Sequence, residues 1–358
     1  MTIQELTIKA IGLLKNLIET PFSFSSEEDL TAQLLENWFQ EYNIPYTRTQ
    51  NNVWSVNKHF DTNKPTLLLN SHHDTVKPNN GYTKDPFKAI VEDGKLYGLG
   101  SNDAGGCLVS LLATYTHFYQ KENLTYNLVF AGTAEEESSG PNGLNGLLKT
   151  LPKIDVAIVG EPTLMNLAIA EKGLVVFDAE VKGTPSHAAH PNHDNAIYNA
   201  IEVLQWFKDV EFEKTSKTLG DVKLTVTQIN AGKQHNAVPS EVKLVIDVRV
   251  NDQYTNQEIS DILQEHAPCN IQPRSLNLNS SSIPKEHPLV QAGIALGRKT
   301  YGSPTLSDQA VLSCPSLKLG PGDSTRSHTA DEFIYLQEIE EGIELYIKLL
   351  NKVVRCEY

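Results

Sequence analysis

The segment Asn127–Gly143 reads NLVFAGTAEEESSGPNG and joins a short apolar run to three consecutive carboxylates. The run Leu128–Ala131 is followed closely by Glu135, Glu136 and Glu137. Short apolar runs of this kind are typical of strands that are covered on both faces. Adjacent carboxylates repel one another and lose hydration beside a buried strand end, so their presence here needs a chemical reason.

Similar runs recur through the first half of the chain and alternate with helical periodicity. Strands are expected over 66–71, 128–132 and 155–160, and helices over 3–18, 30–42 and 107–118. This alternation predicts an α/β domain in which helices cover both faces of the sheet.

From Gly173 the pattern changes. Strands are expected over 173–183, 223–232, 241–251 and near 269–278, with one helix over 195–210 and another opened by the capping box Thr255/Glu258. The first of these helices is expected to bury the stripe Ile197, Ala200, Ile201 and Leu204. The resulting β-α-β-β-α-β order predicts a ferredoxin-like sandwich.

After residue 283 the α/β pattern resumes, with a helix over 290–299, a strand near 317–319 and a closing helix from Leu336. The second domain therefore interrupts the first. The predicted division is a catalytic domain made of residues 1–172 and 284–358, with residues 173–283 inserted.

Composition excludes several classes of protein. The net charge of −14 argues against binding to nucleic acid or to anionic membrane surfaces, and no apolar run is long enough to span a bilayer. The first twenty residues lack the basic start and apolar core of a secretory signal. The four cysteines form no Cys-x-x-Cys pair, which favours a reducing compartment, so a cytoplasmic location is expected. Cys107 lies in an apolar helical stretch and is expected to be buried rather than catalytic.

Imidazoles and carboxylates follow the expected strands at their carboxyl ends, where open α/β sheets bind ligands. The first strand leads into Ser71-His72-His73-Asp74, the second into the three glutamates, the third into Glu161 and the last into His328, while Asp103 stands where a glycine-rich turn enters a helix.

Metal ions are the simplest reason to collect such groups, because they offset the repulsion among carboxylates. Mixed imidazole and carboxylate ligation suits zinc, with cobalt or manganese as substitutes, and two metals that share one carboxylate form a hydrolytic site. Each group also has a plainer interpretation: His73 as a structural residue, the glutamates as a solvated loop and Asp103 as a helix cap. Because all of these groups are expected at one edge of the sheet, a metal site is favoured over the plainer interpretations.

The motifs SHHDTV, GLGSNDAGG, TAEEES, GEPT, GTPSHAAHP, QHNAVPSEVKLVIDVR and GPGDSTRSHTADE occur in this order along nearly the whole chain. As a set they resemble the M20 metallopeptidases, which include acetylornithine deacetylases, succinyl-diaminopimelate desuccinylases, aminoacylases and glutamate carboxypeptidases. The resemblance implies a mixed sheet in a zinc-exopeptidase-like catalytic domain, and it makes the inserted domain a lid and dimerisation domain.

Carried over by position, the resemblance implies that Asp103 bridges two zinc ions. His72 and Glu161 would complete the ligands of one ion, and Glu137 and His328 those of the other.

The resemblance also implies catalytic roles beside the metals. Asp74 would hold the His72 ring through its second nitrogen. Glu136 would act as general base, taking a proton from the attacking water and returning it to the leaving amine. Glu135 is interpreted as support for the loop, with plain solvation as the alternative.

Three further residues are expected to contact the substrate. His187 matches a histidine that polarises the scissile carbonyl, commonly from the partner subunit of a dimer, and Asn236 matches a lid residue near the same oxyanion. Arg326 is a candidate for binding the α-carboxylate of the substrate, with a structural ion pair to Asp323 or Asp331 as the alternative.

These assignments predict a two-zinc amidohydrolase that removes an acyl group from a small amino acid, with N-acetylornithine as the leading substrate and arginine biosynthesis as the pathway. N-acetylcitrulline is the nearest alternative, followed by succinyl-diaminopimelate and dipeptides. A catalytically silent metal-binding homologue and a thiol or serine hydrolase are weaker alternatives from other classes.

Overall fold

The computed structural model describes residues 2–20 and 28–355, which divide into two compact units. The first unit comprises the chain up to Ile169, Ile283–Tyr301 and the chain from Ser307 onward. The second comprises Ala170–Ser282 together with Gly302–Leu306. This last short segment was expected in the catalytic domain.

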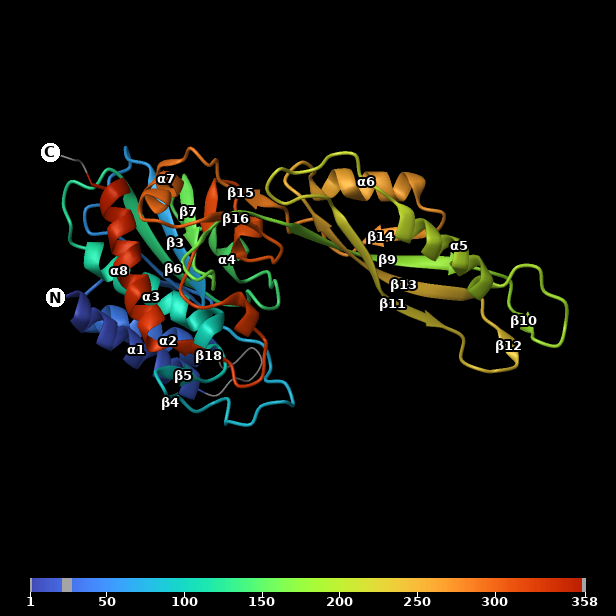
Figure 1. Cartoon of the computed structure of the whole chain (residues 1–358), viewed down its shortest axis with the longest axis horizontal. Helices are drawn as coiled ribbons and strands as arrows, with labels where there is room; N and C mark the ends of the chain where they lie inside the picture. Colours follow the sequence, from blue (N-terminus) through green and yellow to red (C-terminus); the bar gives the residue numbers. More distant parts are fainter. Residues whose placement is uncertain (1, 21–27, 356–358) are drawn as a thin grey trace. The chain divides into compact units, whose positions relative to one another are not determined.

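The helices and strands of the first unit are shown in Figure 1. In chain order they are α1 (Ile3–Glu19), α2 (Glu28–Glu41), β1 (Thr47–Thr49), β2 (Asn52–Val56), β3 (Thr66–His72), β4 (Ile90–Glu92), β5 (Lys95–Tyr97), α3 (Gly106–Phe118), β6 (Asn127–Thr133), α4 (Leu144–Leu147), β7 (Val156–Val159), α7 (Pro288–Ala295), β17 (Ser316–Lys318), β18 (Phe333–Tyr335) and α8 (Leu336–Val353). Three further strands, β8 (Leu167–Glu171), β15 (Ser281–Ser282) and β16 (Thr300–Ser303), lie where the chain passes from one unit to the other.

The main sheet has the strand order β1-β2-β6-β3-β7-β17-β8-β15, with β16 also paired to β8. The central strands β6, β3, β7 and β17 are parallel, whereas β1, β2 and β8 run antiparallel to their neighbours. The sheet is therefore mixed, as expected. A small antiparallel sheet, β18-β5-β4, accompanies it.

Helices cover both faces of this sheet because alternate strand residues point to opposite sides. Leu67 and Leu69 pack into the large core that α1, α3 and α8 supply, while Leu68 packs into a smaller cluster with Leu144 and Leu147 of α4. α3 and α8 also pack against each other. The predicted fold class of the catalytic domain is confirmed.

The second unit has the β-α-β-β-α-β order that the sequence predicts. Its elements are β9 (Gly173–Lys182), β10 (Ser186–His187), α5 (Ala196–Asp209), β11 (Lys223–Ala231), β12 (Ala237–Val238), β13 (Glu241–Val250), α6 (Asn256–His266) and β14 (Asn270–Pro273). The antiparallel sheet order β11-β13-β9-β14 is that of a ferredoxin-like sandwich. The capping box of α6 is present, with Thr255 and Glu258 each accepting the other's backbone N–H.

The predicted apolar stripe of α5 is wrong in part: Ala200 is buried and Leu204 packs against the core, whereas Ile197 and Ile201 are exposed. The buried residues of this helix are Ala196, Ala200, Val203 and Phe207, at intervals that keep them on one helix face. Ile201 is 64% exposed. The helix is thus rotated relative to the expectation, so that Val203 and Phe207 are buried in place of Ile197 and Ile201.

α7 ends at Ala295, four residues before the predicted end at Lys299. Gly297 stops it, since its φ of +81° has the left-handed sign that closes helices.

Among the described residues, no helix combines the length and the apolar character needed to cross a membrane.

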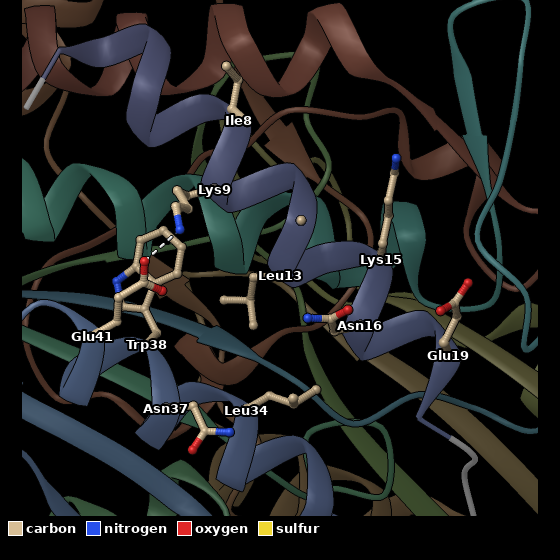
Figure 2. Close-up of a pocket in the computed structure, with 11 residues that line it drawn as sticks. Ile8, Lys9, Leu13, Lys15, Asn16, Glu19, Leu34, Asn37, Trp38 and Glu41 are labelled. Carbon is tan, nitrogen blue, oxygen red and sulfur yellow. Dashed lines mark hydrogen bonds and ion pairs between the residues drawn. The ribbon is translucent and has the colours of Figure 1, made fainter.

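A groove of about 500 Å³ lies between α1 and α2 (Figure 2). Leu13, Leu34 and Trp38 are among the residues that line it, and Lys9 of α1 and Glu41 of α2 form an ion pair of 2.6 Å. None of the site residues named from the sequence lines this groove.

Candidate metal centre

The parallel strands bring the expected groups to one edge of the main sheet. His72 is the last residue of β3 and pairs in register with Thr133, the last residue of β6, after which the glutamate loop begins. Glu161 follows the end of β7, and His328 lies on the loop that leaves β17. Because these four strands are parallel neighbours, their carboxyl ends meet.

Asp103 lies between the two histidines. Its Oδ1 is 3.4 Å from Nε2 of His72, and its Oδ2 is 3.6 Å from Nε2 of His328. Each oxygen of one carboxylate thus faces a different imidazole. This is the arrangement that a carboxylate shared by two metal ions requires.

The remaining expected ligands surround this pair. Glu161 Oε1 is 3.7 Å from Nε2 of His72, and Glu137 Oε2 is 3.1 Å from Nε2 of His328. Ligand atoms of His72, Asp103 and Glu137 all lie within 4.8 Å of one another. We call the following set the acidic centre: His72, Asp74, Asp103, Glu136, Glu137, Glu161 and His328.

Asp74 connects the histidine to the glutamate loop. Nδ1 of His72 is 3.0 Å from the backbone oxygen of Asp74 and 3.4 Å from its Oδ1. The same carboxylate accepts the backbone N–H groups of Glu136 at 3.2 Å and Glu137 at 3.1 Å. Asp74 therefore orients the ring and fixes the loop, as a residue behind a metal ligand does.

The consecutive glutamates have different surroundings. Glu136 points into the acidic centre, with Oε2 4.0 Å from Nε2 of His72. The carboxylate of Glu135 instead accepts the backbone N–H and side-chain amide of Asn142 at 2.9 and 3.0 Å. Glu135, whose φ is +58°, closes the loop, so the solvation alternative does not hold for it.

The acidic centre carries more negative charge than its two imidazoles balance. Burial raises the pKa of Glu161 to about 8, and the negative charge of Asp103 adds to this rise. Burial also raises the pKa of Glu136 well above its usual range, with Glu161 and Asp308 contributing. Burial opposes protonation of His72, but the nearby carboxylates of Asp103 and Asp74 outweigh it and raise the pKa of this imidazole.

The donor set fits metal ions. Nε2 of His72 is buried and, among the described residues, has no hydrogen-bond partner. A buried polar atom left without a partner is costly unless a ligand satisfies it. Imidazole and carboxylate ligands together suit zinc, cobalt or manganese. His72, Asp103, Glu137, Glu161 and His328 are the residues that could hold such ions.

The plainer structural interpretation holds for His73 and Cys107 but not for Asp103. His73 is buried between Thr31 Oγ1 and the backbone oxygen of Asn51, each at 2.8 Å, so its structural interpretation holds. Cys107 is buried as expected, and its thiol donates to the backbone oxygen of Pro321. Asp103 does not cap α3, whose N-cap is Gly105 without a side-chain hydrogen bond.

Arg326 pairs with a residue that the sequence did not indicate. Its two terminal nitrogens donate to the carboxylate of Glu338 at 2.7 and 3.0 Å, and its guanidinium also lies over the ring of Phe333. Asp331, one of the expected partners, instead accepts the backbone N–H groups of Thr83 and Lys84. The guanidinium is therefore already engaged within the protein.

His187 and Asn236 come together on a two-stranded ribbon of the second unit. β10 and β12 are antiparallel, with His187 opposite Ala237, and the backbone N–H of Ala188 donates to the oxygen of Asn236 at 3.0 Å. Both side chains are exposed.

Two carboxylates beside the acidic centre, the half-buried Asp308 and the buried Glu332, were not identified from the sequence. Asp308 accepts the Thr133 hydroxyl at 2.8 Å, and burial raises its pKa to about 6. Glu332 accepts backbone N–H groups around Asp103, and burial raises its pKa to about 7. Glu332 is the last residue of the motif GPGDSTRSHTADE, so its place in that motif could have identified it as a site residue. Asp308 gave no such signal, because it follows Ser307 in a stretch that resembles an ordinary helix start.

A family model described as "Peptidase family M20/M25/M40" matches residues 68–352. Similar curated proteins include an acetylornithine deacetylase of Proteus mirabilis (strain HI4320), 28% identical and covering 97% of both chains. A succinyl-diaminopimelate desuccinylase of Rickettsia bellii (strain RML369-C) is 25% identical and covers 95% of this chain and 96% of the relative.

Solved structures share the fold at lower identity. An M20 family metallo-carboxypeptidase from Sulfolobus solfataricus aligns with a TM-score of 0.75 at 15% identity, over 96% of this chain and 99% of that one. A dinuclear metal binding peptidase of the M20 family from Bacillus subtilis gives a TM-score of 0.75 at 15% identity, over 97% and 98%.

Proposed function

This chain belongs to the peptidase family M20/M25/M40, a family of metal-dependent hydrolases, and from that membership we propose that it is a two-zinc amidohydrolase acting on small N-acylated amino acids. The observation that carries the proposal is the position of Asp103, whose two oxygens face His72 and His328 separately. In this proposal Glu161 completes the first metal position and Glu137 the second.

Glu136 is the proposed general base. Its carboxylate lies in the acidic centre without being needed as a ligand, close enough to accept a proton from an attacking water and to return it to the departing amine. Bound zinc ions would polarise the amide carbonyl and lower the pKa of that water. Asp74 keeps the loop of Glu136 and Glu137 in place through two backbone N–H groups.

The second unit is proposed to supply the oxyanion donors. His187 and Asn236 are neighbours on the β10–β12 ribbon, and neutral or cationic donors aimed at a developing oxyanion contribute a few kcal/mol each. Arg326 is left out of the proposed substrate-binding set. Binding a substrate carboxylate would require it to leave Glu338.

N-acetylornithine is the proposed substrate. Relatives named acetylornithine deacetylase match over almost the full length at 27–28% identity, which supports deacetylation of this amino acid and a place in arginine biosynthesis. The relative named succinyl-diaminopimelate desuccinylase favours a succinylated substrate as the second candidate. Substrates that differ at the acyl group or the side-chain tip are separated by pocket contacts.

The test is amine release from N-acetylornithine, N-acetylcitrulline and N-succinyl-diaminopimelate by zinc-loaded protein, with a chelated sample as control. We expect zinc-dependent release with the highest kcat/KM for N-acetylornithine. A preference for either of the other two compounds would change the substrate assignment but not the assignment as a hydrolase. Equal activity in the chelated sample would contradict the metal mechanism.

We also propose that the chain forms a homodimer through its second unit. β11 is an edge strand of the four-stranded sheet, and it exposes Ile229. On α5, Tyr198 is 69% exposed and Ile201 is 64% exposed. An unpaired edge strand next to exposed apolar side chains favours association with a second copy.

The dimer is tested by Ile201→Glu, measured by light scattering and by activity. We expect a monomer that loses activity, since His187 is proposed to act across the interface. Ile8→Glu is the matched control, because Ile8 on α1 is also 64% exposed but belongs to the first unit. A fully active Ile201→Glu monomer would contradict the role of His187 across the interface.

A further inference from the structure

Glu332 is a buried carboxylate that is neither one of the candidate metal ligands nor the proposed general base. It follows His328 by four residues and directly precedes β18. Its side chain is almost completely buried, with 1% exposure for the residue. Buried carboxylates are rare unless they are paired or strongly hydrogen-bonded, so its contacts indicate what it does.

The carboxylate and the backbone oxygen of Glu332 accept hydrogen bonds from the segment that carries Asp103. Oε1 accepts the backbone N–H groups of Asn102 at 2.8 Å and Asp103 at 2.9 Å. Oε2 accepts that of Gly100 at 3.2 Å, and the backbone oxygen of Glu332 accepts that of Gly98 at 3.1 Å. Glu332 therefore accepts hydrogen bonds from four backbone N–H groups within residues 98–103.

The segment needs these partners because it is not a regular helix. Ser101–Gly105 form one wide turn, and Asp103 has a non-helical φ of −117° and ψ of 100°. The N–H groups of Asn102 and Asp103 donate to Glu332 rather than to backbone carbonyls, and buried N–H groups without partners are destabilising. A charged acceptor also makes hydrogen bonds about twice as strong as a neutral one.

A second connection fixes the same turn to the loop of His328. Asn102 accepts the backbone N–H of Asp323 and donates to its backbone oxygen, each at 3.0 Å. Asp323 precedes His328 and Glu332 follows it, so the turn is held on both sides of the histidine. The relative positions of Asp103 and His328 are thereby set together.

We propose that Glu332 is a positioning residue that sets the orientation of the Asp103 carboxylate between the two metal positions. This inference rests on the proposed two-metal function. Glu332 ligates nothing itself; it fixes the backbone from which the shared ligand projects. Loss of its charge loosens Asp103 and weakens metal binding, while the substrate contacts stay unchanged.

The test is Glu332→Gln, which keeps the size of the side chain and replaces one acceptor oxygen by an N–H₂ group facing backbone donors. We expect zinc affinity, measured by competition with a chelator, to fall roughly 10- to 100-fold. We also expect kcat to fall with KM nearly unchanged, and the visible spectrum of the cobalt-loaded protein to shift. A purely structural role would lower thermal stability without moving the cobalt spectrum or the zinc affinity.

Asp331→Asn is the matched control. It removes a carboxylate from the adjacent residue, but the remaining Oδ1 can still accept the N–H groups of Thr83 and Lys84, and zinc affinity should stay at the wild-type value. Should Glu332→Gln not fold, Glu332→Asp keeps the charge with a shorter reach and carries the same measurements.

Wild-type zinc affinity and cobalt spectrum in a folded Glu332 variant would overturn the inference. Failure of the proposed function has a different signature, since the wild-type protein itself would then bind fewer than two zinc ions or release no amine.

Discussion

At the scale of single residues, the chemistry of Glu136 depends on its environment rather than on its type. Glu135 and Glu136 are adjacent and chemically identical, yet one closes a loop on Asn142 and the other points at His72. Burial and neighbouring carboxylates raise the pKa of Glu136 inside the acidic centre.

Glu136→Gln should therefore keep zinc and lose hydrolysis. The amide cannot accept the proton of the attacking water, so we expect kcat to fall by about 10²–10⁴-fold. Metal content and kcat are to be measured on the same preparation. Glu135→Gln is the matched control and should retain kcat within a few-fold; full activity of Glu136→Gln would refute the base assignment.

Gly320 is a residue at which a single methyl group should be costly. A Cβ atom there would lie 2.5 Å from Sγ of Cys107 and 2.5 Å from the backbone oxygen of Glu161. Gly320→Ala is expected to lower the free energy of unfolding by about 1–3 kcal/mol in urea titrations.

Gly12→Ala is the control for this substitution. Gly12 lies in α1, and nothing is within 4 Å of the position of its Cβ. Alanine should stabilise this helix by about 0.5–1 kcal/mol. Equal effects of the two substitutions would show that packing around Gly320 is looser than the distances indicate.

At the scale of elements, the two central strands β3 and β7 are joined at their starts by Asp155. Its carboxylate accepts the backbone N–H of Thr66 at 2.9 Å, and its own backbone N–H donates to Thr66 at 3.0 Å. The ion pair with Lys153 and the N–H of Thr66 lower the pKa of Asp155 in the folded protein.

Asp155→Ala should destabilise the protein by about 1 kcal/mol at pH 7. Because the folded-state pKa is lowered, the charged form contributes stability above the unfolded pKa of about 3.9, and this contribution is lost as the pH falls through the folded value. The unfolding curves of variant and wild type should converge in that acidic range.

Lys153→Ala separates the two partners of Asp155. The side chain of Lys153 is 86% exposed, so its removal should have a smaller effect than that of Asp155. A larger effect of Lys153→Ala would place the stabilisation in the ion pair rather than in the connection between strands.

At the scale of the whole molecule, the acidic centre lies entirely in the first unit. Metal that binds only the folded state stabilises it by about 4 kcal/mol when its free concentration is a thousand times Kd. Chelation should therefore lower the unfolding temperature of the first unit in calorimetry and leave that of the second unchanged. Re-addition of zinc should restore both stability and activity; an unchanged scan after verified zinc removal would contradict this.

Much of this protein follows from its sequence alone. Local hydrophobic period predicted β3, β6, β7 and β17 of the first unit and the four main strands of the second, because burial on one or both faces determines which residues are apolar. It missed the short strands β1, β2, β4, β5 and β18 and the short helix α4. The order of those elements predicted the α/β domain and the ferredoxin-like unit, and the family resemblance implied the mixed sheet. His72, Glu136, Glu161 and His328 each lie at or after a strand end. This indicated that they share one edge of the sheet, because parallel neighbouring strands end together.

Only the tertiary structure decided the contacts between distant segments. The face of α5 that is buried depends on how the helix packs on its sheet, and the sequence period allowed a different face. The partner of Arg326 is Glu338 rather than Asp323 or Asp331, and Glu332 reaches back to residues 98–103 across more than two hundred positions. Such contacts depend on loop paths and on the needs of buried N–H groups, which no local pattern encodes.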